Sequence, residues 1–134
     1  MEDIVVCSYY DGQVNTCSLG RVQLSYLPGE NRLWASGGAM DCYYDCVYKL
    51  KDGIMEEIAK GEYGAEDNSN VQWDEDGYPV YQYFWNGEEV TENTYDKKLN
   101  KAYKNKSEQA VEKLEWYDSV YHAYESFILN KNEK

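Results

Sequence analysis

Three tight-turn dipeptides constrain this chain most: Asp11-Gly12, Asp52-Gly53 and Asn86-Gly87 each follow a run of strand-forming residues. A two-residue type I′ hairpin turn requires positive φ at both central positions, and Asp-Gly tolerates that conformation. Short runs rich in β-branched and aromatic residues, bounded by such turns, are typical of antiparallel strands. The first two-thirds of the chain is therefore predicted to fold as a series of hairpins.

The clearest hairpin spans residues 42–63 and turns at Asp52-Gly53. An uninterrupted register would place opposite charges on one face and small or apolar side chains on the other. Opposite-charge pairs across two strands stabilise a sheet by up to about 1 kcal/mol each, and a one-residue slip would scramble both faces. The predicted pairs are Lys49 with Glu56, Val47 with Ile58, Asp45 with Lys60, Leu50 with Met55, and Cys46 with Ala59.

Further strands are predicted at residues 4–7, 21–26 and 33–35, the last ended by Ser36-Gly37-Gly38. Residues 64–77 are polar, acidic and rich in turn formers, which predicts a loop longer than usual, and such loops are often functional. Residues 78–85 are aromatic on both faces and are interpreted as an interior strand, with Pro79 tolerated near its start.

The last third of the chain is predicted to be helical. Thr91 can cap a helix over residues 92–104, and Ser107 can cap a second helix that reaches Leu129. The fold class is therefore α+β: one domain, residues 1–134, with an antiparallel β-meander in residues 1–90 packed by two C-terminal helices in residues 91–130. The second helix has one apolar stripe, formed by Ala110, Leu114, Tyr117, Tyr121, Tyr124 and Ile128.

Charge is distributed unevenly along the chain, whose net charge is −12. Residues 61–96 hold ten acidic and no basic side chains. Direct binding to nucleic acid would need the opposite charge balance, whereas a negative field favours a basic protein partner. The acidity is also explained by solubility alone. No apolar run is long enough to span a membrane, and no basic-then-apolar leader of the signal-peptide type is visible in the sequence.

Catalytic and metal-binding motifs are not found in the sequence. His122 stands alone, and no Gly-x-Ser-x-Gly motif supplies a nucleophile for it. An EF-hand aligned on Gly77 would need Tyr83 as its closing carboxylate, so the calcium pattern fails. Zinc-type Cys-x-x-Cys spacing and a glycine-rich phosphate loop are also missing. We therefore expect no catalytic residue and no cofactor.

The four cysteines divide into two pairs. Cys7 and Cys17 flank the Asp11-Gly12 turn, and a three-residue loop would bring them opposite each other, within reach of a disulfide. Cys42 and Cys46 would be about 13 Å apart along one strand, which is too far for a bridge. We interpret the second pair as small buried hydrophobic residues.

A candidate partner-binding surface combines the acidic loop with the aromatic strand that follows it. Tyr and Trp side chains are the usual anchors of protein interfaces. Half of the aromatic residues are expected to face the core. The predicted site comprises Glu62, Glu66, Asp67, Trp73, Asp74, Glu75, Asp76, Tyr78, Tyr81, Tyr83 and Trp85.

Three motifs of the chain suggest a known kind of module. They are Val47-Tyr48-Lys49-Leu50-Lys51-Asp52-Gly53, Ile58-Ala59-Lys60-Gly61-Glu62-Tyr63-Gly64 and Trp85-Asn86-Gly87-Glu88-Glu89-Val90-Thr91. With them, residues 33–104 resemble a module of secreted proteins and lipoproteins of clostridia and related gut bacteria. The resemblance implies an extracellular or cell-surface location and a module that is largely of unknown function. Many of those modules carry an Asp-rich, calcium-like loop before the first strand, and this chain begins at that strand.

Three functional hypotheses follow from these features. The leading one is a non-enzymatic, tyrosine-rich interaction module that binds a basic protein. The second is an acidic inhibitor that mimics the charge of nucleic acid and so binds a basic, nucleic-acid-handling protein. The third is a hydrolase built on two of the many carboxylates, one of which would need a raised pKa.

Overall fold

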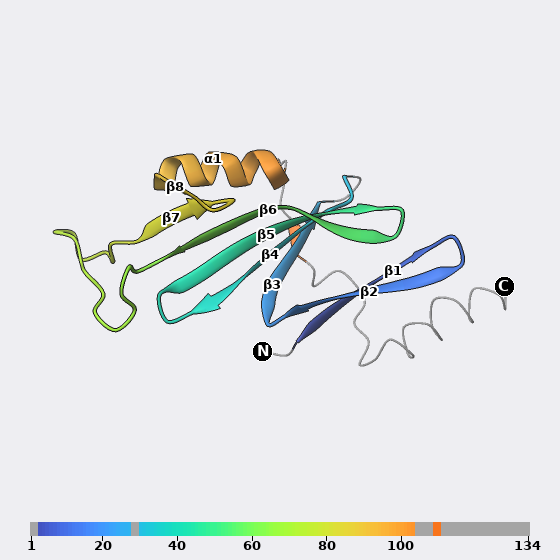
Figure 1. Ribbon diagram of the computed structural model, residues 1–134, viewed down its shortest axis with the longest axis horizontal. Coiled ribbons are helices and arrows are strands. Elements are labelled where there is room, and N and C mark those ends of the chain that lie inside the picture. The colour runs from blue at the N-terminus through green and yellow to red at the C-terminus, as the bar shows by residue number, and fades with distance from the viewer. Residues whose placement is uncertain (1–2, 28–29, 104–108, 111–134) are drawn as a thin grey trace.

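The computed structural model describes residues 3–27, 30–103 and 109–110, which form two antiparallel sheets and one helix (Figure 1). A two-stranded sheet pairs β1 with β2, and a seven-stranded sheet has the order β8-β7-β6-β5-β4-β3-β9. The elements are β1 (Ile4–Tyr10), β2 (Gln13–Gly20), β3 (Val22–Leu27), β4 (Arg32–Ala39), β5 (Cys42–Lys51), β6 (Ile54–Gly64), β7 (Gln82–Trp85), β8 (Glu88–Val90), α1 (Glu92–Tyr103) and β9 (Gln109–Ala110).

Strands β3 to β8 follow one another in the sheet as they do along the chain, so the predicted antiparallel meander is confirmed for these strands. The meander predicted for residues 1–90 does not include β1 and β2, which form a sheet of their own. The three predicted tight turns are also confirmed. Asp52 and Gly53 have φ of 51° and 77°, and the other two dipeptides likewise have positive φ at both positions. These turns need residues that tolerate the left-handed region, which explains why the sequence marks them clearly.

The hairpin of β5 and β6 departs from the predicted register halfway along. Pairing is as predicted from the turn to Tyr48 and Glu57, but a β-bulge then leaves Ile58 as an extra residue. Val47 consequently pairs with Ala59, and the predicted pairs of Val47 with Ile58, Cys46 with Ala59 and Asp45 with Lys60 are wrong. The bulge brings small residues to the face that receives α1.

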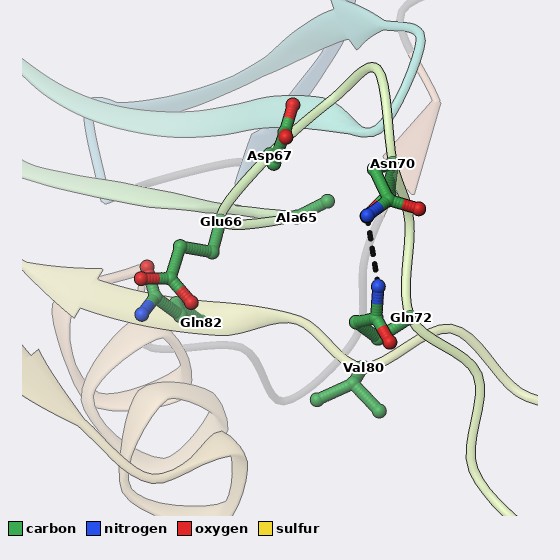
Figure 2. A pocket seen from close by; sticks show the side chains of 7 residues that line it. All are labelled: Ala65, Glu66, Asp67, Asn70, Gln72, Val80 and Gln82. Carbon is green, nitrogen blue, oxygen red and sulfur yellow. Dashed lines mark hydrogen bonds between the residues drawn. The ribbon is translucent and has the colours of Figure 1, made fainter.

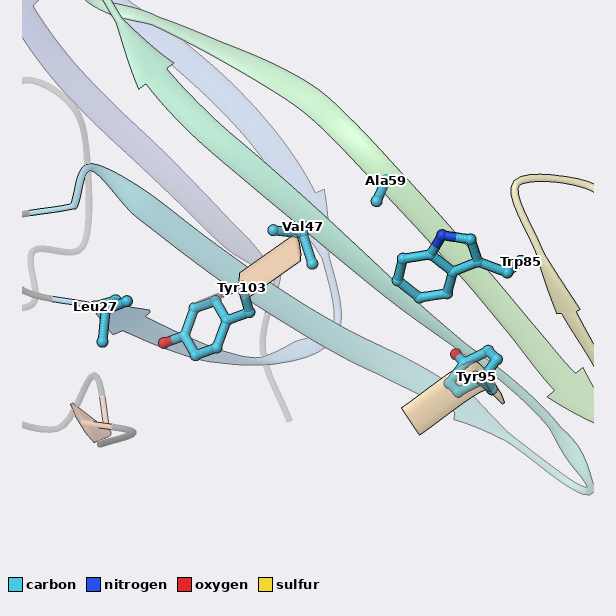
Figure 3. Close-up of a cluster of buried hydrophobic side chains, with 6 residues drawn as sticks. All are labelled: Leu27, Val47, Ala59, Trp85, Tyr95 and Tyr103. Carbon is cyan, nitrogen blue, oxygen red and sulfur yellow. The ribbon is translucent and has the colours of Figure 1, made fainter. Parts of the chain in front are cut away.

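Helix α1 packs on one face of the seven-stranded sheet. Its buried tyrosines, Tyr95 and Tyr103, lie against a cluster of buried residues from four strands (Figure 3). An added Cβ at Gly61 would lie only 2.4 Å from the Tyr95 hydroxyl, so the missing side chain lets the helix approach. The buried hydrophobic strand residues on this face are Leu27, Val47, Ala59 and Trp85.

The hairpin of β1 and β2 packs against part of the opposite face of the sheet. Val22, Leu24 and Ala35 are buried there, with Ile4, Val6 and other half-buried side chains packed against them. Helix α1 and the β1–β2 hairpin therefore pack on opposite faces of the seven-stranded sheet.

Both ends of α1 are capped by side chains, one local and one distant in the sequence. The Thr91 hydroxyl accepts a hydrogen bond from the Thr94 amide at 3.2 Å, which confirms the predicted N-cap. At the other end the Arg32 guanidinium donates to the Ala102 carbonyl oxygen at 2.5 Å. A cation is favourable at the C-terminus of a helix, so this contact stabilises the helix and joins it to β4.

Three other predicted elements need correction. β4 extends through Ser36-Gly37-Gly38 instead of ending there, because cross-strand pairing continues to Ala39. The aromatic strand is short: residues 78–81 fold back on the loop, and β7 begins only at Gln82. The described residues hold one helix, not two. Gln109 and Ala110, predicted to be helical, form β9 beside β3, and the rest of the predicted second helix lies outside the described residues.

Candidate functional site

The loop between β6 and β7, residues 65–81, contains a small hairpin of its own. The Val80 amide donates to the Gln72 carbonyl oxygen at 2.8 Å, and the Asp74 amide donates to the Tyr78 carbonyl oxygen at 2.8 Å. Between these bonds Trp73 and Pro79 form an isolated antiparallel bridge. Residues 72–80 therefore have a defined backbone conformation, and we call this segment the loop hairpin.

Asp74 closes the turn at the tip of the loop hairpin. One of its carboxylate oxygens accepts hydrogen bonds from the amides of Asp76 and Tyr78, both at 2.9 Å. Its carbonyl oxygen accepts a third bond from Gly77, whose φ is 83°. This is the side-chain-to-backbone bonding for which Asp is favoured in turns. Asp74 therefore acts within the chain and holds the tip in shape.

Asp67 stabilises the other half of the loop in the same way. Its carboxylate accepts hydrogen bonds from the Ser69 hydroxyl at 2.7 Å and from the Ser69 amide at 3.0 Å. These bonds favour the charged carboxylate, so the pKa of Asp67 lies below its ordinary value. The charge at this position is consequently retained in mildly acidic solution.

Large apolar side chains project into solvent from the loop hairpin. Trp73 is 63 % exposed, Tyr78 is 68 % exposed, and Val80 is also exposed. The acidic side chains of Glu75 and Asp76, at the tip between them, are exposed as well. We define these five residues as the loop-hairpin surface. An exposed Trp and Tyr held on a fixed backbone is the arrangement expected of interface anchors.

A hollow of about 440 Å³ lies beside this surface, between the first half of the loop and the start of β7 (Figure 2). Along one wall, the side-chain amide of Gln72 donates a hydrogen bond to the backbone carbonyl oxygen of Asn70 at 3.3 Å. Five of the seven lining residues are polar, and Glu66 and Asp67 bring two carboxylates to the hollow. Its lining residues are Ala65, Glu66, Asp67, Asn70, Gln72, Val80 and Gln82.

Tyrosines form a row across three strands next to the loop. Tyr43, Tyr63 and Tyr83 are direct cross-strand neighbours in β5, β6 and β7. The Tyr63 and Tyr83 rings are stacked with centroids 5.5 Å apart, and the Tyr43 ring lies 5.3 Å from Tyr63. Burial, together with the carboxylate of Glu92, raises the pKa of Tyr83 to about 12. Burial likewise raises the pKa of Tyr63, so these two side chains resist ionisation in alkaline solution.

Tyr81 joins the tyrosine row to the turn between β4 and β5. Its ring lies 6.1 Å from Tyr43 and 6.2 Å from Tyr63, and its hydroxyl donates to the Asp41 carboxylate at 2.5 Å. That hydrogen bond to a carboxylate raises the pKa of Tyr81. The contact fixes the C-terminal end of the loop against the sheet.

A buried carboxylate lies behind the tyrosine row. Asp45 is only 5 % exposed, and its two oxygens accept hydrogen bonds from Trp34 Nε1 at 2.8 Å and from the Tyr95 hydroxyl at 2.5 Å. Burial and this bond raise the pKa of Tyr95. Both carboxylate oxygens are occupied by groups that join β4, β5 and α1, so the geometry indicates a structural role for Asp45.

The structure divides the predicted site residues into three groups. Trp73, Asp74, Glu75, Asp76 and Tyr78 are brought together on the loop hairpin, and Glu66 and Asp67 line the adjoining hollow.

The remaining predicted residues are less accessible to a binding partner or lie apart from the loop hairpin. Trp85 is only 7 % exposed and packs edge-on against Tyr95, so it belongs to the core. Tyr81 and Tyr83 are half-buried in the tyrosine row. Glu62 lies on the opposite face of β6 from Tyr63, where its carboxylate is 3.2 Å from the Lys60 ammonium.

Four residues of this region were not identified from the sequence: Asp41, Tyr43, Tyr63 and Val80. An unbulged hairpin places Tyr43 opposite Glu62, whereas the bulge moves its partner to Tyr63. The tyrosine row could therefore not be predicted, because the assumed register of β5 and β6 was wrong by one residue on this side of the bulge. Val80 was assigned to a strand, and the backbone bond to Gln72 shows that it belongs to the loop hairpin.

The cysteines do not pair in the structure. The Asp11-Gly12 turn has two residues, so Cys7 lies opposite Thr16 and Cys17 lies opposite Val6. The disulfide considered for Cys7 and Cys17 is contradicted, since neighbouring positions in a strand point to opposite faces and both thiols are free.

The two cysteines of the second pair differ in exposure. Cys46 is buried as predicted, donates to Glu57 Oε1 at 3.5 Å, and has a pKa of about 11 because burial and that carboxylate disfavour the thiolate. Cys42 is exposed, contrary to the prediction, because it begins β5 at a turn.

Within the described ranges, no group of three or more His, Cys, Asp or Glu side chains is arranged to hold a metal ion. The candidate His122 lies outside those ranges. The described part of the chain also contains no helix that is long and apolar enough to cross a membrane.

Comparison with known proteins gives no match to a family model, to a curated protein or to a solved structure. The resemblance to clostridial cell-surface modules accordingly stays a prediction from the sequence motifs.

Proposed function

We propose that this protein is a non-enzymatic interaction module that binds a basic protein through the loop-hairpin surface. The observation that carries the proposal is the exposure of Trp73 and Tyr78, both above 60 %, on a backbone that is already fixed by hydrogen bonds and a bridge. Large aromatic side chains normally lie in a core or an interface, because their apolar area is costly to leave in water.

The fixed backbone supports strong binding. A loop that must become ordered on association loses part of its binding free energy to conformational entropy. The loop hairpin has largely lost that entropy in the free protein, since Asp74 closes its tip and Tyr81 is bonded to Asp41 at its base. Two rigid aromatic anchors on such a loop are therefore the best candidates for the residues that dominate affinity.

Charge supports a basic partner. Glu75 and Asp76 lie between the two anchors, and Glu66 and Asp67 line the hollow beside them. No lysine or arginine lies within residues 61–96 to neutralise these carboxylates locally. A complementary positive surface would be guided to the loop electrostatically, which raises the association rate more than the final affinity.

The same surface is compatible with an inhibitor that mimics nucleic-acid charge, and salt dependence separates the two functions. Charge mimicry relies on many carboxylates, so its binding should weaken steeply with salt. Binding anchored by Trp73 and Tyr78 should weaken mainly through a slower association rate, with dissociation nearly unchanged.

The proposal is tested by comparative capture and then by measured affinity. The wild-type protein, Trp73→Ala, Tyr78→Ala and the matched control Tyr9→Ala are immobilised, and bound proteins are identified by mass spectrometry. Tyr9 is nearly as exposed as the anchors but lies in β1. A true partner should be retained by wild type and by Tyr9→Ala. Its purified form should bind each anchor variant about 30-fold or more weakly, as expected for an interface hot spot.

Replacement of Glu75 and Asp76 by lysine gives the electrostatic test. With the purified partner, this double variant should slow association and reduce its salt dependence, with a smaller effect on dissociation. Identical sets of captured proteins for wild type and for both anchor variants would refute the proposed binding surface.

A further inference from the structure

The turn between β4 and β5 holds a residue that its backbone conformation does not favour. Ala39 pairs with Cys42, so Met40 and Asp41 form a two-residue turn, with φ of 55° and 63°. Positive φ at both positions is the type I′ geometry, which Asn, Asp and Gly adopt most readily. Among the described residues, six non-glycine residues have positive φ, and Met40 is the one that is neither Asp nor Asn. The chain therefore carries methionine where a turn-forming residue would be more stable.

The Met40 side chain lies in solvent. It is 84 % exposed, a larger fraction than for Trp73 or Tyr78. Packing within the chain consequently gives it little that would offset the unfavourable backbone conformation. Residues that break a local rule without a gain in stability are expected at functional sites. Methionine is flexible and polarisable, and it is common on surfaces that bind other proteins. Position and residue type together favour a contact role for Met40.

The β4–β5 turn is bonded to the loop that carries the loop-hairpin surface. The Asp41 carbonyl oxygen accepts a hydrogen bond from the Ala65 amide at 2.9 Å, and the Asp41 carboxylate accepts one from the Tyr81 hydroxyl at 2.5 Å. The Met40 carbonyl oxygen accepts a third bond from the Asn68 side-chain amide at 3.3 Å. Ala65 and Tyr81 are the first and last residues of the loop. The turn therefore holds both ends of the loop, and the two lie at the same end of the seven-stranded sheet (Figure 1).

The hollow of about 440 Å³ lies between the loop segment bonded to the turn and the loop hairpin (Figure 2). Asp67, which precedes Asn68, lines the hollow on the side of the turn, and Val80 lines it on the side of the loop hairpin. Glu66 is also part of the lining. Two carboxylates therefore lie between the exposed Met40 side chain and the exposed apolar side chains of the loop hairpin.

We propose that Met40 is a third apolar anchor of the partner-binding surface, which then extends from the loop hairpin across the hollow to the β4–β5 turn. The inference rests on the proposed function and specifies the kind of segment that this surface fits. That segment places apolar side chains on Met40, Trp73 and Tyr78, and its lysine or arginine side chains meet the carboxylates between them. The fixed turn keeps the methionine in solvent in the free protein, so its apolar area is buried, and contributes to affinity, only on binding.

Thermal stability tests the argument from the turn without a partner. Met40→Asn replaces the unfavourable residue, so it should raise the midpoint of thermal unfolding by about 3 °C. Met40→Leu keeps a large apolar side chain on the same backbone, so its midpoint should lie within about 1 °C of the wild-type value. Asp52 has the equivalent position in the β5–β6 turn, with φ of 51°. Asp52→Met should therefore unfold at a lower temperature than the equally uncharged Asp52→Asn.

Binding is measured with random-sequence peptides displayed on phage and selected on the wild-type protein. The selected peptides should contain both basic and apolar residues. Met40→Asn should weaken their binding about fivefold or more, although this variant is more stable, whereas Met40→Leu should bind them within about twofold of wild type. Asp52→Met, at the other end of β5, should leave their affinity unchanged.

The Trp73→Ala variant separates failure of this inference from failure of the proposed function. Selected peptides that need Trp73 but bind Met40→Asn as tightly as wild type would show that Met40 lies outside the contact, and the proposed function would remain. Peptides that need Met40 but not Trp73 would support the β4–β5 turn as an anchor and refute the loop hairpin as one. Selection that enriches no peptide on the wild-type protein would overturn both proposals.

The thermal midpoints give a second way to overturn the inference. A midpoint for Met40→Asn at or below that of wild type would show that the methionine does not destabilise the free protein, so its presence in the turn would need no functional reason.

Discussion

Asp45 joins three elements on the helix side of the core. Its carboxylate accepts hydrogen bonds from Trp34 of β4 and Tyr95 of α1, and it is itself part of β5. A buried carboxylate is tolerated only when its oxygens are bonded, because desolvation of an unpaired charge costs several kcal/mol. Both donors are aromatic residues, so the same side chains pack in the core and donate the hydrogen bonds that the Asp45 carboxylate needs.

Replacement of Tyr95 by phenylalanine tests this network. The ring and its contacts with Tyr63, Tyr83 and Trp85 remain, but one Asp45 oxygen loses its donor. The free energy of unfolding should fall by about 1–3 kcal/mol, measured by urea denaturation. The matched control is Tyr9→Phe at an exposed position, which should change stability by less than about 0.5 kcal/mol. Equal stability of the two variants would show that the bond is energetically unimportant.

Gly61 is a second residue on which the position of α1 depends. A Cβ at this position would lie 2.4–2.5 Å from the hydroxyl oxygen and two ring carbons of Tyr95, closer than real side-chain contacts. Gly61→Ala should therefore destabilise the protein by about 1–3 kcal/mol through overpacking. In a Tyr95→Leu background the same substitution should cost much less, and the difference measures the coupling. Additive costs in this double-mutant cycle would contradict the steric explanation.

At the scale of elements, the sequence predicts local features well and long-range adjustments poorly. The turn at Asp52-Gly53 and the Thr91 cap were predicted correctly, since each depends on a few adjacent residues. The bulge at Ile58 was not, because its advantage arises only when α1 packs on Ala59 and Gly61.

The candidate site shows the same division. That Trp73 belongs to an accessible acidic loop could be predicted from composition and turn residues, whereas Tyr78 was assigned to the strand that follows the loop. The sequence could not show that Trp85 is buried beneath Tyr95 while Tyr78 is not, because both occur in one aromatic run. Their separation depends on Pro79 and its bridge to Trp73, which keep residues 78–81 out of β7.

The N-cap of α1 offers a test at this scale. Thr91→Ala removes the acceptor for the Thr94 amide and should lower the free energy of unfolding by about 1 kcal/mol. Thr91→Ser keeps a hydroxyl oxygen in the same place, so it should restore nearly all of that stability in the same urea titration. A serine variant as unstable as the alanine variant would indicate that the threonine methyl group matters instead of the cap.

At the scale of the whole molecule, the free energy of unfolding should be most sensitive to alkaline pH, because several tyrosine hydroxyl groups are buried or half-buried. Burial holds the pKa of Cys46 at about 11 against an ordinary 9.0, and that of Tyr83 at about 12 against 10.0. The pKa values of Tyr48, Tyr63 and Tyr95 are also raised, with burial as the first cause in each. In all of these groups the folded protein favours the protonated, uncharged form.

The direction of the pH effect follows from proton linkage. Above pH 9 the unfolded chain releases protons from these groups before the folded protein does, so the unfolded state binds fewer protons. The free energy of unfolding should consequently be at its full value below pH 9 and fall between pH 9 and 12. Urea midpoints at several pH values would measure this decline, with phenolate absorbance recorded in parallel. In Tyr83→Phe the decline between pH 10 and 12 should be smaller, because one titrating group is gone. Stability that stays constant up to pH 12 would show that the tyrosine row is open to water, contrary to its packing between the loop and α1.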